Sequence, residues 1–310
     1  MSHEAIERLR QNIMSVYMGN GAAVDRIIVC LLARGHVLIE DVPGVGKTVL
    51  ANALAKSIKC TFTRIQCTPD LLPSDITGVS IYNRERGDFE FKPGPIFHNV
   101  IVADEINRTT PRTQSALLEA MSELTVSVDG IVHRLEEPFL VVATQNPYEF
   151  EGTFYLPENQ LDRFLMRIGL GYPAPSDESR IILQQPARTT LQDLQPAASS
   201  EEILALQRLV DAVKLDQGLV DYVIALAQAT RENDDLQVGV SPRGALALAQ
   251  AARATAVIQG RDYCVPEDVV SNVVPVCSHR VISKSYLNIG DTATTRRIIQ
   301  QVLETVPSPA

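Results

Sequence analysis

Short continuous apolar runs recur along the first half of the chain, and each run stops at polar or turn residues. Runs that lack polar alternation are typical of parallel strands that are buried on both faces. Apolar residues at helical spacing lie between these runs and predict helices. The predicted strands fall at 36–40, 100–103, 139–144 and shortly after 163, and the predicted helices at 4–33, 47–59 and 113–122. This order predicts an α/β fold with a parallel sheet flanked by helices.

From residue 177 onward the pattern changes, because strand-like runs stop and helical spacing continues. The change follows the turn-forming segment PAPS at 173–176. Apolar residues at helical spacing occupy 201–213, 219–230, 242–259 and 266–276. We therefore expect two domains, an α/β domain over 1–175 and a smaller, all-helical lid domain over 176–310.

Two segments of the first half predict inserted β-hairpins. Alternation over 79–91 surrounds the polar turn NRERGD, and alternation over 124–135 surrounds Asp129-Gly130, a strong short-range hairpin signal. The first hairpin is not needed to cover the sheet. It is therefore a candidate for a moving or partner-contacting part, with a plain surface hairpin as the alternative.

Residues 36–48, HVLIEDVPGVGKT, predict a strand, a glycine-containing turn and the start of a helix. Gly44 and Gly46 allow the backbone to curl, so that successive N–H groups can point at a polyphosphate at the positive end of the helix. Lys47 would add a point charge on the β/γ-phosphates, and the Thr48 hydroxyl could ligate Mg²⁺. The segment therefore predicts a phosphate-binding loop.

One position departs from the strict form of that loop. Asp41 stands where the motif has its first glycine, but aspartate tolerates turn and left-handed geometry better than most residues. A chance glycine turn is the alternative if the loop is taken alone. The residues expected to contact the nucleotide are Asp41, Val42, Pro43, Gly44, Val45, Gly46, Lys47, Thr48 and Val49.

Two carboxylates, Asp104 and Glu105, directly follow the apolar run 100–103. Open α/β sheets bind ligands at the carboxyl ends of their strands. Asp104 could hold Mg²⁺ through a water, and Glu105 could polarise the water that attacks the γ-phosphorus. Acids also occur at strand ends for structural reasons, but their position downstream of GKT favours the catalytic interpretation.

Two amides, Gln145 and Asn146, follow the run 139–144. An amide at this strand tip could orient the hydrolytic water or contact the γ-phosphate. The residues alone leave both candidates open, and the family resemblance given below favours Asn146.

A helix break near the N-terminus adds two residues with two possible roles. The break includes Tyr17 and Met18 and continues through Gly21. Such a break can lie beside the base of a bound nucleotide, so Tyr17 and Met18 could touch adenine. A plain core role fits their chemistry equally well.

Two arginines are candidates for stabilising negative charge. Arg163 follows Asp162 in a polar turn, from which it could reach another subunit, and a guanidinium delivered in trans accelerates phosphoryl transfer by orders of magnitude. The alternative is an ion pair within the chain, to Asp162 or another acid.

Arg243 falls in the first turn of the helix that Ser241 and Pro242 begin. A cation is disfavoured there, so either a nucleotide phosphate or a surface acid should lie nearby.

Composition excludes several classes of protein. The chain has 310 residues, of which 45% are hydrophobic and 21% charged, as in ordinary soluble globular proteins. No apolar run approaches the roughly 20 residues of a membrane span, and the N-terminus has no signal-peptide core, so we expect a cytoplasmic protein without membrane insertion. The net charge of −9 argues against general nucleic-acid binding. The five cysteines lack CxxC spacing and favour buried thiols.

The order of these motifs resembles that of the AAA+ P-loop ATPases, most closely their MoxR family. The segments DVPGVGKT, DEINR, ATQNP, LPENQLDRF and SPRGA are similar to that family's motifs, and the match runs along nearly the whole chain. The hairpins resemble the family's helix-2 insert and pre-sensor-1 hairpin. The resemblance implies Walker A roles for Lys47 and Thr48, Walker B roles for Asp104 and Glu105, sensor 1 for Asn146, the arginine finger for Arg163 and sensor 2 for Arg243.

The resemblance also implies ATP and Mg²⁺ as cofactors, a homo-hexameric ring, a von Willebrand factor A domain partner and a client protein complex. It favours an ATP-driven chaperone that remodels clients, matures them or inserts their cofactors. A nucleic-acid motor or transcription activator is a second possibility, which the acidic balance disfavours and which would need a basic pore or a GAFTGA-type loop. A nucleotide-gated scaffold with negligible hydrolysis is a third.

Overall fold

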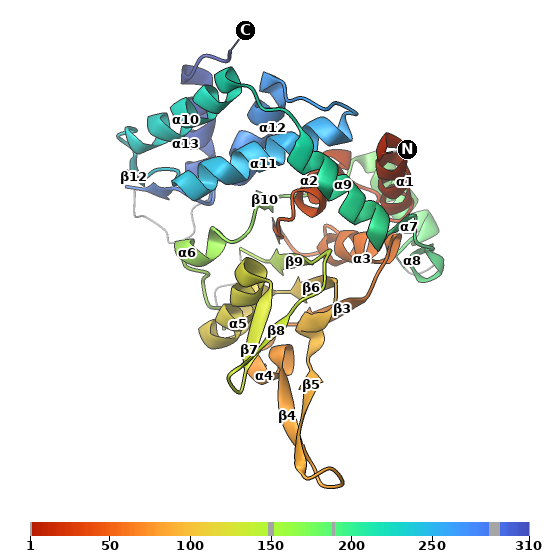
Figure 1. Ribbon diagram of the computed structural model, residues 1–310. Helices are drawn as coiled ribbons and strands as arrows, with labels where there is room; N and C mark the ends of the chain where they lie inside the picture. The colour runs from red at the N-terminus through yellow and green to blue at the C-terminus, as the bar shows by residue number, and fades with distance from the viewer. Residues whose placement is uncertain (1, 148–151, 188–189, 285–291, 310) are drawn as a thin grey trace.

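A five-stranded parallel sheet forms the centre of the N-terminal half (Figure 1). The computed structural model describes residues 2–147, 152–187, 190–284 and 292–309. The strands lie in the order β10-β1-β9-β6-β3, and each neighbouring pair is parallel. Their bounds are β1 Val37–Glu40, β3 Phe62–Gln66, β6 Val100–Asp104, β9 Leu140–Gln145 and β10 Met166–Ile168. The sheet therefore confirms the predicted α/β fold.

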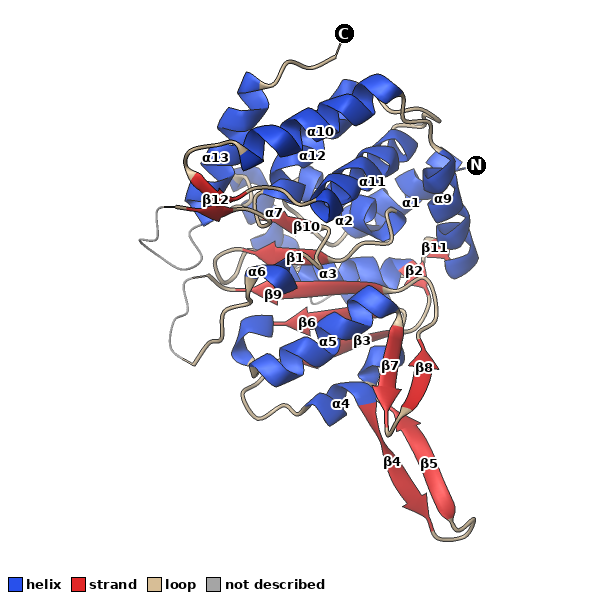
Figure 2. Ribbon diagram, turned by 60° about the vertical axis from the view of Figure 1, so that its left-hand side comes forward, coloured by secondary structure: helices blue, strands red, loops and turns tan. Residues whose placement is uncertain are grey.

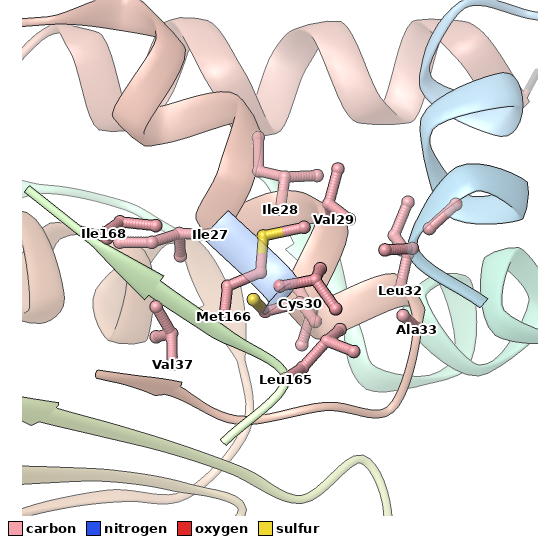
Figure 3. Close-up of a cluster of buried hydrophobic side chains, with 14 of the residues drawn as sticks. Ile27, Ile28, Val29, Cys30, Leu32, Ala33, Val37, Leu165, Met166 and Ile168 are labelled. Carbon is pink, nitrogen blue, oxygen red and sulfur yellow. The ribbon is translucent and has the colours of Figure 1, made fainter. Parts of the chain in front are cut away.

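Helices cover both faces of this sheet. One face packs on α1 (Ser2–Met14), α2 (Gly21–Leu32) and α3 (Lys47–Ser57), and Figure 3 shows the side chains of α2 directed at those of β10. The other face packs on α5 (Pro111–Glu123). Because side chains alternate along a strand, successive residues of one strand enter different clusters: Val37 and Ile39 belong to the first, and Leu38 to the second.

Two β-hairpins project from the sheet, as the turn signals predict. The longer one pairs β4 (Gly78–Asn83) with β5 (Asp88–Pro93) and extends away from the C-terminal helices (Figure 2). The shorter one pairs β7 (Thr125–Val128) with β8 (Ile131–Arg134). The ring of Phe91 stacks on that of His133 with centroids 4.1 Å apart, so the two hairpins are in contact at their bases.

The C-terminal half is a helical lid, as expected. Its helices pack against one another and share the first core cluster with α2. They are α9 Ser200–Ala212, α10 Gln217–Arg231, α11 Pro242–Ile258, α12 Pro266–Cys277 and α13 Thr292–Thr305. The Ser241 hydroxyl accepts a hydrogen bond from the Gly244 N–H at 3.1 Å, which confirms the predicted start of α11. None of the helices in the described ranges combines the length and apolar composition needed to cross a bilayer.

Several short elements were not predicted. Strand β3 was missed, because its sequence FTRIQ carries polar residues at the edge of the sheet. Within the lid, β12 and β13 form a short antiparallel pair, and β11 pairs with β2 beside the sheet. The remaining elements are β2 Ile58–Lys59, α4 Pro73–Thr77, α6 Glu158–Leu161, α7 Pro175–Gln184, α8 Thr190–Asp193, β11 Ala198–Ser199, β12 Leu236–Val238, β13 Ile282–Ser283 and the 3₁₀ turns Pro95–Phe97 and Ile106–Arg108.

Candidate nucleotide site

The loop between β1 and α3 has the shape of a phosphate-binding loop. Gly44 and Gly46 have φ angles of 85° and 92°, a left-handed conformation that glycine adopts without steric cost. Because α3 begins at Lys47, the backbone N–H groups of its first turn lie where the loop ends. A Cβ built on Gly44 would meet no described atom within 4 Å, so there is open space at the loop.

The Lys47 ammonium group lies at the carboxyl end of the sheet. It donates to the backbone carbonyl of Asp41 and, at 2.9 Å, to that of Gln145 at the end of β9. The positive charge is thus held beside the loop, as the motif predicts.

Asp41 stabilises the loop through its side chain. The carboxylate accepts hydrogen bonds from the backbone N–H of Val42 at 2.8 Å and from those of Leu170 and Gly171 at 2.7 Å each. These contacts join the start of the loop to the chain that follows β10. Asp41, which replaces the first glycine of the strict motif, therefore fixes the start of the loop through side-chain hydrogen bonds that glycine could not make.

Asp104 is buried, with 2% exposure, and both of its carboxylate oxygens accept hydrogen bonds. Oδ1 accepts from the hydroxyls of Thr48 at 3.1 Å and Thr144 at 3.2 Å, and Oδ2 accepts from Nε of Arg64 at 2.6 Å. The two predicted Mg²⁺ ligands, Thr48 and Asp104, are therefore in direct contact.

Glu105 lies beside this network in a left-handed backbone conformation, with a φ of 56°. Its N–H donates to the Thr144 hydroxyl at 3.0 Å. Its Oε2 lies 3.1 Å from Nε of Arg108 and 3.4 Å from Nε2 of Gln66. The carboxylate is thus held in one orientation at the carboxyl end of β6. A general base needs a fixed position of this kind, because it must lie within hydrogen-bond reach of the proton that it accepts.

These residues fit a magnesium nucleotide. The loop offers backbone donors and an ammonium group for phosphate, while Thr48 and Asp104 offer oxygen ligands for Mg²⁺. Oε1 of Gln145 is buried and has no hydrogen-bond partner within the described ranges. A buried oxygen of this kind calls for a polar partner, which a nucleotide or its water would supply.

The other residues predicted to contact the nucleotide differ in how deeply they are buried. Asn146 is buried, and its carbonyl accepts from Nδ2 of Asn107 at 3.4 Å, so both candidate amides lie at the tip of β9. Of the other loop residues, Val45 is buried, Pro43 is exposed, and Val42 and Val49 pack on the first core cluster.

Tyr17 and Met18 are both buried, as the core alternative for them requires. The Tyr17 ring lies against the phosphate loop, because a Cβ built on Gly46 would be 3.4 Å from Cε2 of Tyr17. Burial raises the pKa of Tyr17 to about 12. Contact of either residue with adenine stays a prediction.

The two predicted arginines lie at the end of the sheet where the parallel strands begin, which we call its amino edge. The phosphate loop lies at the opposite end, where the strands stop, which we call its carboxyl edge. Arg163 precedes β10, whose first residue Met166 pairs with Val37, the first residue of β1. The phosphate loop follows the last residue of β1, and a four-residue strand spans about 13 Å. The structure therefore does not bring Arg163 to the phosphate loop of its own chain.

Both arginines have partners within the chain. Nη1 of Arg163 donates to the Leu118 carbonyl at 2.6 Å and to the Ser122 hydroxyl at 3.1 Å, near the end of α5, instead of pairing with Asp162. Nε of Arg243 lies 3.6 Å from Oδ2 of Asp162, so a carboxylate is the anion near the start of α11.

Four of the residues in these networks were missed by sequence reasoning: Arg64, Gln66, Thr144 and Arg280. Arg64 and Gln66 lie on the overlooked β3, where the aromatic and β-branched residues of FTRIQ were an available signal. Arg280 follows α12, and its partner Asp162 is 118 residues away, so no local pattern points to it.

Comparisons with known proteins agree with this geometry. A model of the ATPase family associated with various cellular activities (AAA) matches residues 36–166, and a model of the AAA lid domain matches residues 228–302. The chain is 40% identical to "Chaperone MoxR1" of Mycobacterium tuberculosis, over 98% of this chain and 82% of that protein. It is 30% identical to "Protein MoxR" of Methylorubrum extorquens, over 99% and 96%. A crystal structure of a candidate ATPase from Cytophaga hutchinsonii has a TM-score of 0.89 and 37% identity, covering 100% of this chain and 96% of that one.

Proposed function

Because this chain belongs to the MoxR family of AAA+ ATPases, we propose that it hydrolyses ATP at the boundary between two copies of itself and uses the reaction to remodel client protein complexes. The observation that carries the proposal is that the predicted phosphate, metal and water ligands lie at one end of the sheet and the two predicted trans arginines at the other. The carboxyl edge holds Lys47, Asp104 and Glu105, and the amino edge holds Arg163 and Arg243. One copy would therefore supply the acids and a second copy the arginines.

Thr48 and Asp104 would hold Mg²⁺, which when bound neutralises phosphate charge and orients the oxygens of the γ-phosphate. Lys47 and the N–H groups at the start of α3 bind the phosphates. Arg64 pairs with Asp104 at 2.6 Å and holds this carboxylate in place.

Glu105 would act on the attacking water. Its carboxylate accepts the proton of that water, while Arg108 and Gln66 hold the side chain in place. Asn146 or its neighbour Gln145 would hold the water in line with the γ-phosphorus, because both lie at the tip of β9 next to β6. Arg163 and Arg243 of the adjoining copy would stabilise the charge that develops on the phosphoryl group.

The hairpins are the proposed means of contact with a client or partner. Large apolar side chains are exposed on both of them: Tyr82, Phe89, Ile131 and Val132. Exposed apolar groups of this kind mark sites of protein interaction. A hexameric ring, a von Willebrand factor A domain partner and a client complex belong to this proposal through the family, one of whose members is named a chaperone.

Steady-state ATP hydrolysis by the wild type and by Glu105→Gln tests the enzymatic part. The amide cannot accept a proton, so turnover should fall roughly 100-fold or more while affinity for ATP is retained. Wild-type turnover no faster than that of the variant would instead support a nucleotide-gated scaffold. Strong stimulation of turnover by DNA would support a nucleic-acid motor.

A further inference from the structure

The carboxylate of Asp162 is shared by two arginines of the lid. Oδ1 lies 2.8 Å from Nε of Arg280, which follows α12, and Oδ2 lies 3.6 Å from Nε of Arg243, at the start of α11. Asp162 itself belongs to the α/β half and directly precedes Arg163. One acidic side chain therefore pairs with two arginines of the lid and directly precedes Arg163, the other proposed trans arginine.

The contact with Arg280 is fixed. The Arg280 side chain is only 3% exposed and also donates to the carbonyls of Phe164 at 2.6 Å and Leu165 at 3.0 Å. A buried guanidinium with this many acceptors cannot leave without an uncompensated charge remaining in the protein. Arg280 thus holds the segment 162–165 against the lid.

The contact with Arg243 is exchangeable. The Arg243 side chain is 56% exposed, and the distance of 3.6 Å is that of a loose ion pair. If Arg243 leaves, Asp162 keeps its bond to Arg280, so no buried charge loses its partner. Exchange of Arg243 from Asp162 to another anion should therefore cost little.

We propose that Asp162 is a positioning residue that holds Arg243 back in the free subunit and releases it to the triphosphate bound by the adjoining copy. The inference rests on the proposed function. A phosphate carries more negative charge than one carboxylate and can replace Asp162 as the partner of Arg243. Arg280 keeps Asp162 and the neighbouring Arg163 in place during this exchange, so release of Arg243 leaves the segment 162–165 undisturbed.

A double-mutant cycle on nucleotide affinity tests the competition. Binding of a fluorescent, slowly hydrolysed ATP analogue is measured with full-length protein, at protein concentrations at which it self-associates. Asp162→Asn, which removes the competing charge, should tighten binding roughly threefold to tenfold. In an Arg243→Gln background the same substitution should leave affinity unchanged, because no guanidinium remains to be released.

Several results would overturn the inference. Unchanged or weaker binding by Asp162→Asn contradicts competition, and an equal shift in both backgrounds shows an effect independent of Arg243. If Asp162→Asn fails to fold, Asp162→Glu replaces it; the retained, longer carboxylate should weaken binding, and tighter binding contradicts the proposal. A wild type that binds no analogue overturns the proposed function and this inference together, whereas a wild type that binds without coupling overturns only the inference.

Discussion

The two edges of the central sheet differ in how their functional groups are brought together. At the carboxyl edge, Lys47 and Asp104 each belong to a short sequence motif at the end of a strand, β1 and β6. At the amino edge, Asp162 and Arg280 meet across 118 residues, and Arg243 joins them from a third segment. The first edge carries the predicted ligands of phosphate and Mg²⁺, with Arg64 and Arg108 paired to its acids. The second edge carries Arg163 and Arg243. In the proposed function, the acids of one copy and Arg163 and Arg243 of a second copy complete the site together.

Removing Arg163 gives the largest effect predicted for the amino edge. Arg163→Ala should lower turnover by roughly 10³- to 10⁵-fold, because the guanidinium stabilises charge only in the transition state. Affinity for ATP should stay near that of the wild type. Turnover assays and analogue binding are compared with those of Arg180→Ala, in which an exposed arginine of α7 is removed. Wild-type turnover in Arg163→Ala would rule out a trans finger.

The amino edge also contains a buried histidine that makes stability depend on pH. His36 precedes β1, its Nε2 lies 3.0 Å from the Met121 carbonyl, and its Nδ1 accepts from the Val141 N–H at 3.0 Å. Burial lowers the pKa of His36 from 6.5 to about 4. The unfolded chain therefore binds the proton more tightly, so the stability from this group is complete above about pH 6.5 and is lost as pH falls towards 4.

Urea unfolding measures this effect. The free energy of unfolding of the wild type should fall by about 2 kcal/mol more between pH 7 and pH 5 than that of His36→Gln. Glutamine can keep a donor for Met121 and an acceptor for Val141 but does not titrate. Equal pH dependence in the two proteins would show that His36 is not held neutral in the fold.

A substitution at Gly244 tests how closely the lid packs around Arg280. A Cβ at this position would lie 2.8 Å from Cγ1 of Val240 and 3.1 Å from Cδ of Arg280. Gly244→Ala should therefore lower the free energy of unfolding by about 1–2 kcal/mol, although alanine normally stabilises a helix. Gly218→Ala, in the first turn of α10, should be neutral or stabilising in the same urea titration, since its nearest neighbour is 3.4 Å away. Equal stability of the two variants would contradict this close packing.

Substitution of Asp41 tests the loop at the carboxyl edge, and its expected effect, on nucleotide affinity, is the smallest of those predicted. Asp41→Ala removes the acceptor of three backbone N–H groups, so the loop should lose part of its fixed shape. Binding of the ATP analogue should weaken roughly threefold to tenfold, and Asp41→Asn, which keeps one acceptor oxygen, should be affected less. Undiminished affinity in Asp41→Ala would show that the loop holds its shape without this anchor.

The features that could be predicted from the sequence are those built from residues close together in the chain. Neighbouring residues determine the phosphate loop, the two acids at the end of β6 and both hairpins, so the spacing of residues along the chain was sufficient to predict them. Strand β3 was missed because an edge strand is not a continuous apolar run, and Arg64 was missed with it. The partners of Arg163 and Arg243 depend on how distant helices pack, which no local pattern determines.

Mixing two inactive variants tests the shared site most directly. Glu105→Gln retains the arginine edge, and Arg163→Ala retains the acidic edge, so each should hydrolyse almost no ATP alone. In a mixture, some boundaries combine an intact Glu105 from one copy with an intact Arg163 from the next. The account predicts that turnover returns on mixing to a clear fraction of the wild-type rate. Turnover that stays at the level of the separate variants, in a mixture shown to co-assemble, would contradict it.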